Sequence, residues 1–89
     1  MSEPPAYVYL LWCGPRRALY CGWSTDVPRR LAAHQQGKGA KYTRSRDPVE
    51  LAASIPMPSV SASRREEARI KRLPRSQKLA LVARHAPLT

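Results

Sequence analysis

The first residues whose side chains could take part in a reaction lie in two aromatic stretches near the amino end. Tyr7-Val8-Tyr9 and Tyr20-Cys21-Gly22 flank a Gly-Pro loop, a pattern typical of two strands joined by a tight turn. If the loop centres between residues 14 and 15, antiparallel counting places Tyr9 opposite Tyr20, with both phenols on one face. Gly22 would let another group approach the backbone there. The alternative is an ordinary cross-strand packing contact.

Two predicted helices carry the other reactive groups. Arg30 and His34 are four residues apart and share one face of a helix expected over residues 27–36. Glu67 lies on a later helix, four residues before Lys71. Taken singly, each has a structural explanation: a solvated cation, a histidine favoured at a helix end, and an i,i+4 ion pair. The neighbouring Glu66 has the spacing of a capping box with Ser63.

The charge of the chain indicates a polyanionic partner. Sixteen Lys and Arg against six Asp and Glu give a formal net charge of +10, a large positive field for so small a domain. An anionic membrane would require a basic helix with bulky apolar residues opposite, whereas these helices offer mainly Ala, Ile and Leu. Nucleic acid is therefore favoured. The expected contacts are basic side chains of the loop over residues 37–46 and of the later helix: Lys38, Lys41, Arg44, Arg46 and Lys71.

That basic loop has two interpretations. It is either a solvated connection or a flexible phosphate clamp in which Tyr42 is available to stack or pack. Its residue types alone do not separate the two.

The periodicity predicts an α/β (α+β) fold with a small three-stranded antiparallel sheet flanked by helices. The third strand is expected over residues 49–55, with Val49, Leu51, Ala53 and Ile55 alternating inward. Helices are expected from a cap near residue 59 or 61 to about residue 73, and over residues 75–83. The 89 residues make one domain over residues 6–84, with tails at 1–5 and 85–89.

Composition also bears on location and metal content. No apolar run is long enough to cross a bilayer and no signal peptide is recognisable, so we expect a cytoplasmic protein. Cys13 and Cys21 are the only cysteines, and we expect them to be unpaired, buried hydrophobic residues. A structural zinc site is not expected.

The ordered set of these positions resembles the GIY-YIG nuclease superfamily, in particular its small single-domain bacterial members. The resemblance rests on Tyr7-Val8-Tyr9, Tyr20-Cys21-Gly22, Arg30 with His34 one turn later, and Glu67 within Arg65–Lys71. The segment from His34 to Thr43 is also similar to that subgroup. Tyr7 replaces the first glycine of the family motif and Cys21 replaces an isoleucine. There is no clear equivalent of a downstream asparagine, and we expect no additional DNA-binding domain.

The resemblance implies a metal-dependent endonuclease that hydrolyses DNA phosphodiester bonds. Tyr9, Tyr20, Arg30, His34 and Glu67 would be its catalytic residues. Glu67 would hold one divalent cation, Mg²⁺ or Mn²⁺, which binds through few carboxylates and keeps much of its water. Arg30 would grip the phosphate through its planar donor fork, and His34 would contact phosphate or relay a proton. Either tyrosine could position or deprotonate the attacking water, with Tyr20 slightly preferred.

The resemblance also points to a substrate class. We expect weak sequence specificity and selectivity for branched, flap or single-stranded DNA, in repair or recombination. The protein would be a monomer, with specificity supplied by its basic surface or by an accessory protein. Two other functions remain open: a non-catalytic nucleic-acid-binding module on a nuclease scaffold, and a basic RNA- or ribosome-associated protein.

Overall fold

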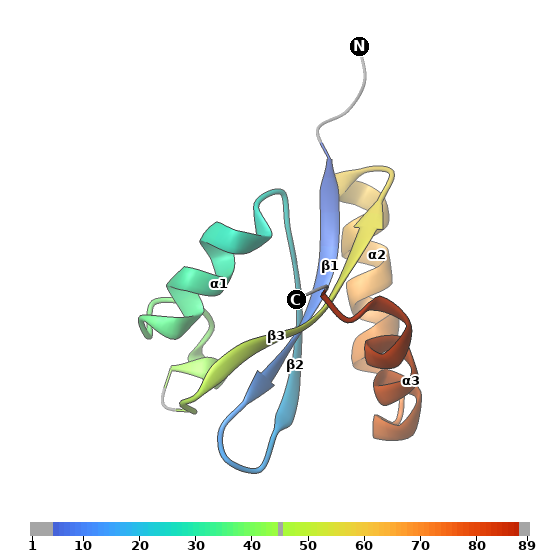
Figure 1. Ribbon diagram of the computed structural model, residues 1–89. Helices are drawn as coiled ribbons and strands as arrows, with labels where there is room; N and C mark the ends of the chain where they lie inside the picture. The colour runs from blue at the N-terminus through green and yellow to red at the C-terminus, as the bar shows by residue number, and fades with distance from the viewer. Residues whose placement is uncertain (1–4, 45, 88–89) are drawn as a thin grey trace.

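The computed structural model describes residues 5–44 and 46–87, which form a three-stranded antiparallel sheet with helices on both faces (Figure 1). Apart from Pro5, the expected amino-terminal tail lies outside the described residues. The elements in chain order are β1 (Ala6–Cys13), β2 (Ala18–Ser24), α1 (Val27–Gln35), the 3₁₀ turn η1 (Lys41–Thr43), β3 (Val49–Met57), α2 (Val60–Lys71) and α3 (Arg75–His85). The strand order is β2-β1-β3, so β1 is central. The predicted fold class is confirmed.

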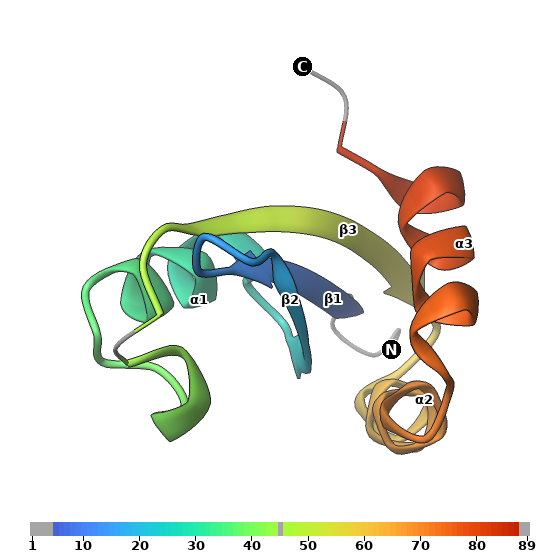
Figure 2. The ribbon, with the colours of Figure 1, turned by 90° about the horizontal axis from the view of Figure 1, so that it is seen from below.

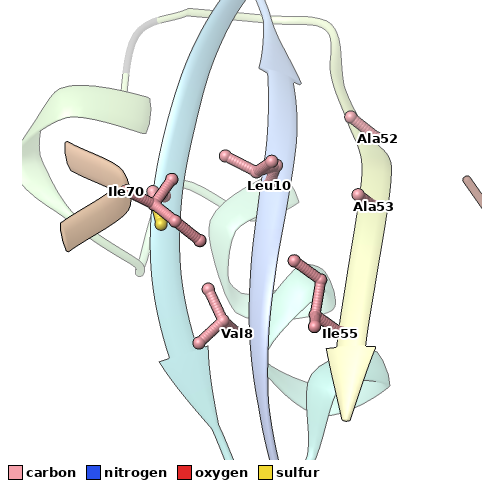
Figure 3. Close-up of a cluster of buried hydrophobic side chains, with 7 residues drawn as sticks. Val8, Leu10, Ala52, Ala53, Ile55 and Ile70 are labelled. Carbon is pink, nitrogen blue, oxygen red and sulfur yellow. The ribbon is translucent and has the colours of Figure 1, made fainter. Parts of the chain in front are cut away.

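Alternation along β1 divides the core into two layers. Val8 and Leu10 pack with Ile70 of α2 on one face (Figure 3). Tyr9 and Leu11 pack on the other face, in a cluster that includes α1 side chains. Helix α1 therefore lies on one side of the sheet and α2 and α3 on the other (Figure 2). The central strand is buried on both faces because it is apolar throughout.

The hairpin register differs from the predicted one. Tyr9 pairs with Gly22, and Tyr20 pairs with Leu11. The turn is centred one residue later than expected, because Arg17 adopts a positive φ of 53° and closes a loop back to the carbonyl of Gly14. The resulting offset between strands is two residues. Side chains along a strand return to the same face of the sheet every two residues, so both tyrosines still project from the same face.

The third strand does not alternate as predicted. Leu10 pairs with Ala53 and Leu11 pairs with Leu51, so Ala52 is an extra residue in β3. This bulge reverses the facing of the residues that follow it. Val49 and Leu51 consequently pack in the Tyr9 layer, and Ala53 and Ile55 pack in the Val8 layer. The strand also continues through Pro56 to Met57, which an edge strand tolerates.

The helix ends follow their capping residues. The Asp26 side chain accepts a hydrogen bond from the backbone N–H of Arg29 at 3.1 Å, and Pro28 occupies the first turn of α1. Gly37, with φ of 75°, lies just beyond the end of this helix. Ser59, one of the two predicted residues, caps α2. No helix among the described residues is both long and apolar enough to span a membrane.

Both cysteines, Cys13 and Cys21, are free and buried, as predicted. Helix α3 ends at His85, two residues beyond the predicted end.

Candidate functional site

A pocket of about 360 Å³ opens beside the first two strands. Tyr9 and Tyr20 line it from the sheet, Arg30 from α1 and Glu67 from α2. Its remaining lining residues come from the end of β2 and the start of the next turn: Gly22, Trp23, Ser24 and Thr25. Because β2 is an edge strand and α2 packs along it, a side chain from α2 can reach this opening. Four of the five predicted catalytic residues therefore meet in one place.

Gly22 is what allows the Tyr9 phenol to reach the pocket. A Cβ atom at this position would lie 2.5 Å from the Tyr9 hydroxyl oxygen and 2.6 Å from Cζ, closer than such atoms pack. The Tyr9 ring therefore crosses the β2 backbone directly over the glycine. The predicted close approach at Gly22 is real, and the group that approaches is Tyr9.

His34 lies beneath the pocket, and its side chain is not exposed within it. The residue is 1% exposed, and its Nε2 atom is 2.9 Å from the Tyr9 hydroxyl. Its Nδ1 atom is 2.7 Å from Oγ1 of Thr43. Burial on the Tyr9 side separates the imidazole from the pocket, so this position does not support the predicted direct contact with phosphate, which stays a prediction. The other predicted role, a proton relay, is compatible with this position.

The hydrogen bonds of this group assign the histidine tautomer. The Thr43 hydroxyl donates to the carbonyl of Ala40 at 3.0 Å, so its oxygen is left to accept from Nδ1–H of His34 at 2.7 Å. The backbone N–H of Ala40 also approaches Nδ1, but at 3.4 Å it is the longer contact, and the tautomer is assigned from the shorter one. Nε2 then carries a lone pair and accepts from the Tyr9 hydroxyl. Burial and the nearby Arg30 guanidinium lower the pKa of His34 below its usual 6.5. The imidazole is therefore neutral at physiological pH.

Sequence reasoning missed two residues that hold His34. Thr43 is 1% exposed and binds Nδ1. Gly39 lies against the imidazole ring, where an added Cβ atom would collide with Nδ1. Both belong to the family-like segment that begins at His34. Their spacing alone gave no sign of this role, because the loop must fold back over the helix before they reach the ring.

The two phenols differ in their surroundings. Tyr9 is 2% exposed, and burial raises its pKa to about 12 against the opposing effect of Arg30. Tyr20 is only partly buried; burial raises its pKa too, and Lys71 lowers it. The ring centres lie 6.5 Å apart, and the Tyr20 ring also lies 5.2 Å from His34. Neither tyrosine is ionised near neutrality, so neither acts as a ready-made phenolate.

The two adjacent glutamates have different partners. Glu66 binds Arg69 through two hydrogen bonds of 2.7 and 2.9 Å, which lower the pKa of its carboxyl group. The predicted capping box is wrong, because Ser63 lies inside α2 and its hydroxyl donates to the carbonyl of Ser59. Glu67 lines the pocket, 3.3 Å from the ammonium of Lys71. Only the second of the two acids faces the phenols.

The pocket offers a divalent cation one protein ligand. Within residues 5–44 and 46–87, no three His, Cys, Asp or Glu side chains cluster as a metal site would require. A single carboxylate suits Mg²⁺, which is bound through one or two carboxylates with water and phosphate completing its shell. The pocket has room for those additional ligands. Glu67 would therefore fit the predicted ion, which would compete there with the ammonium of Lys71.

The predicted nucleic-acid contacts are exposed. Lys38, Lys41, Arg44 and Arg46 project from the segment after α1, and Lys71 lies at the end of α2. The loop includes a 3₁₀ turn, η1. Tyr42, in this turn, stacks on Tyr20, with ring centres 5.8 Å apart. The loop thus reaches the rim of the pocket.

Comparison with known proteins accords with this geometry. The model of the GIY-YIG catalytic domain matches residues 5–80. The chain belongs to this family. The match spans all four residues that meet in the pocket, together with His34 and Thr43. The family assignment supports a nuclease-type function and implies DNA as the substrate.

Similar proteins share the size of this one. A UPF0213 protein of Vibrio cholerae serotype O1 is 52% identical over 89% of this chain and 78% of its own length. A UPF0213 protein of Streptococcus agalactiae serotype V is 46% identical over 96% of both chains. The solution NMR structure of the UPF0213 protein BH0048 from Bacillus halodurans has a TM-score of 0.55 and 44% identity, covering 89% of this chain and 83% of that one. This GIY-YIG protein therefore matches other small proteins over most of their length.

Proposed function

We propose that this GIY-YIG protein is a divalent-metal-dependent endonuclease that hydrolyses DNA phosphodiester bonds. The observation that carries the proposal is the single pocket lined by Tyr9, Tyr20, Arg30 and Glu67. Hydrolysis of a phosphodiester needs an oriented water, neutralisation of the phosphoryl oxygens and stabilisation of the leaving oxygen. The pocket offers a group for each requirement.

Arg30 would bind the phosphate. Its side chain is exposed on α1 and lines the pocket, so its planar guanidinium is accessible to a phosphodiester. Two parallel N–H donors match two phosphoryl oxygens, which a lysine ammonium cannot reproduce. This contact would fix the phosphate over the phenols.

Tyr9 and His34 would handle the proton of the attacking water. Tyr9 lines the pocket, and in the assigned tautomer its O–H donates to Nε2 of neutral His34. A water bound to Tyr9 can pass its proton to the phenol oxygen as the phenol proton moves to Nε2. The phenol is then never required as a free anion, which its pKa of about 12 makes costly. Thr43 holds the imidazole in the accepting tautomer.

Tyr20 has no comparable proton acceptor among the hydrogen bonds of the described residues. We therefore assign the proton transfer to Tyr9, and to Tyr20 the orientation of the phosphate or water beside it. This reverses the slight preference for Tyr20 that the resemblance gave.

Glu67 would hold the cation, Mg²⁺ or Mn²⁺. When bound, the ion supplies charge stabilisation at the leaving oxygen. The Glu67 side chain is 21% exposed, so its carboxylate keeps access to solvent and to an incoming ion. The exposed basic residues around the pocket would hold the DNA backbone with little sequence preference and a steep dependence on salt.

Further details of this function are part of the same proposal. We place its substrates among branched, flap or single-stranded DNAs of repair or recombination, and its action in the cytoplasm. The protein would act as a monomer or with an accessory protein that adds specificity.

The decisive experiment compares two adjacent carboxylates. Labelled single-stranded, duplex, flap and four-way DNAs are incubated with Mg²⁺ or Mn²⁺ and with wild type, Glu67→Gln or Glu66→Gln. Both variants remove one charge from the same helix, but only Glu67 lines the pocket. We expect Glu67→Gln to lower cleavage on the order of a hundredfold or more and Glu66→Gln to retain it. Binding of Mn²⁺ measured by calorimetry should also be lost only in Glu67→Gln.

Two results would refute the proposal. One is wild-type protein that cleaves none of these DNAs with either ion. The other is cleavage by Glu67→Gln at the wild-type rate. Tight, salt-sensitive binding without cleavage would instead identify a non-catalytic nucleic-acid-binding module.

A further inference from the structure

An aromatic stack leads from the pocket to the protein surface. Tyr20 lines the pocket, and the Tyr42 ring lies against it with an interplanar angle of 24°. The guanidinium of Arg46 lies 4.3 Å from the centre of the Tyr42 ring. Three planar groups from β2, η1 and the segment before β3 are thus in contact in series.

Tyr42 is one of the exposed hydrophobic side chains of this protein. It is 40% exposed, and within the described parts of the chain Leu79 is the only other large hydrophobic side chain that is exposed. Leu79 lies on α3, on the opposite side of the sheet (Figure 2). Tyr42 is thus an exposed aromatic ring at the rim of the pocket, among exposed cations.

The position of Tyr42 is fixed by its neighbour. Thr43 is buried, binds His34, and is tied to Ala40 by both its backbone N–H and its hydroxyl. The same residue therefore holds the proton-relay histidine and sets the direction of the adjacent tyrosine. Tyr42 is presented from an anchored turn beside the pocket.

We propose that Tyr42 is a stacking site for an unpaired nucleobase next to the phosphate that is cleaved, and that the base takes the place of Arg46 on its ring. The inference rests on the proposed nuclease function and narrows its substrate class. Aromatic rings and arginine planes are the surfaces on which unpaired bases stack, irrespective of sequence. A cation lying over an exposed ring is held weakly, so a base can replace Arg46 on Tyr42. The released guanidinium is then free to bind the DNA backbone.

This site selects against intact duplex DNA. Paired bases are stacked on one another and offer no free face to Tyr42 near the backbone. A single strand, a flap or the unpaired position of a branched DNA offers one. Among the substrates considered above, those with an unpaired base beside the scissile phosphate are the ones that fit.

The test measures binding with cleavage removed. In a Glu67→Gln background, short single-stranded DNA containing the fluorescent base 2-aminopurine is titrated with protein, and a duplex of the same sequence serves as comparison. Stacking on Tyr42 should quench the fluorescence of the single strand. Tyr42→Ala should abolish the quenching and weaken single-strand binding roughly tenfold, with less than about a twofold effect on the duplex.

Two further variants complete the design. Tyr42→Phe keeps the ring and should behave like its parent, which separates stacking from loss of the hydroxyl. Leu79→Ala, the matched removal of an exposed hydrophobic side chain, should change neither quenching nor affinity. Thermal melts of each variant check that the fold is retained.

The outcomes separate this inference from the nuclease proposal. If the wild type cleaves DNA but Tyr42→Ala retains quenching and single-strand affinity, the stacking site is refuted and the nuclease stands. If no DNA is cleaved but quenching depends on Tyr42, the stacking site stands and the nuclease proposal fails. Equal losses on single-stranded and duplex DNA would also overturn the inference, because they indicate a general backbone contact.

Discussion

Replacing Gly22 with alanine should displace the phenol on which the proposed chemistry depends. The added Cβ atom would lie 2.5 Å from the Tyr9 hydroxyl oxygen, about 0.9 Å short of the 3.4 Å at which ordinary contact begins. Gly22 lies in a regular strand and has no positive φ, so alanine suits its backbone conformation. The whole effect of the substitution must therefore come from the collision with Tyr9.

The magnitude follows from where Tyr9 can go. The ring is buried, and its hydroxyl lies 2.9 Å from His34. A shift of about 0.9 Å away from the added methyl group would lengthen or break this hydrogen bond. Overpacking costs about 1–3 kcal/mol and the hydrogen bond about 1 kcal/mol. We expect a loss of about 2–4 kcal/mol, or roughly 10–30 °C in melting temperature for a domain of this size.

Catalysis should suffer independently of stability. A misplacement of about 1 Å can cost on the order of a hundredfold in rate. The cleavage rate of Gly22→Ala is therefore measured well below its melting temperature, with circular dichroism confirming that the protein is folded. We expect a drop in kcat of about that size.

A double-mutant cycle isolates the cause. In a Tyr9→Leu background the phenol is gone, so Gly22→Ala should cost less than about 0.5 kcal/mol of unfolding free energy. An equal penalty in both backgrounds would show that the collision is not with Tyr9. Unchanged melting temperature and rate in the single variant would refute the close approach itself.

Three further predictions follow from buried groups. The pKa of His34 is lowered in the folded state. The contribution of neutral His34 to the free energy of unfolding is therefore complete above about pH 6.5, and it is lost as the pH falls below that value. Chemical denaturation between pH 7.5 and 5.5 should show this loss in the wild type and not in His34→Gln; parallel curves would contradict it. Thr43→Val removes the acceptor for Nδ1–H and should lower the cleavage rate and cost about 1–3 kcal/mol, whereas unchanged kinetics would exclude a role in holding the tautomer. Ile70→Val shortens a fully buried side chain and should cost about 0.5–1.5 kcal/mol in urea denaturation, and no loss would mean that α2 is not held through this contact.

Much of the fold was predictable because it depends on local chemistry. Alternation along β1 predicted which residues share a face, and the tyrosines do share one. Asp26, Pro28 and Gly37 predicted the bounds of α1 to within one residue. Each of these signals acts over a few residues of chain, so sequence carries it directly.

The predictions of strand pairing were wrong at two places where one extra residue in a turn or strand changes which residues pair. The hairpin register depended on Arg17 adopting a positive φ, which a residue other than glycine rarely does. The alternation in β3 failed at Ala52, whose extra position forms a bulge that residue types do not reveal. The hairpin register differs from the predicted one by two residues, an even number, so both phenols still lie on the same face of the sheet.

The sequence by itself determined the chemical groups of the candidate site: phenols at 9 and 20, the guanidinium at 30 and the carboxylate at 67. Only the tertiary structure decided how they relate. It placed Tyr9 across Gly22, buried His34 between Tyr9 and Thr43, and separated Glu67 from Glu66. The physical reason is distance along the chain. Residues as far apart in the chain as Tyr9 and Glu67 meet only after the sheet and helices have packed, and the direction of each side chain is set by that packing.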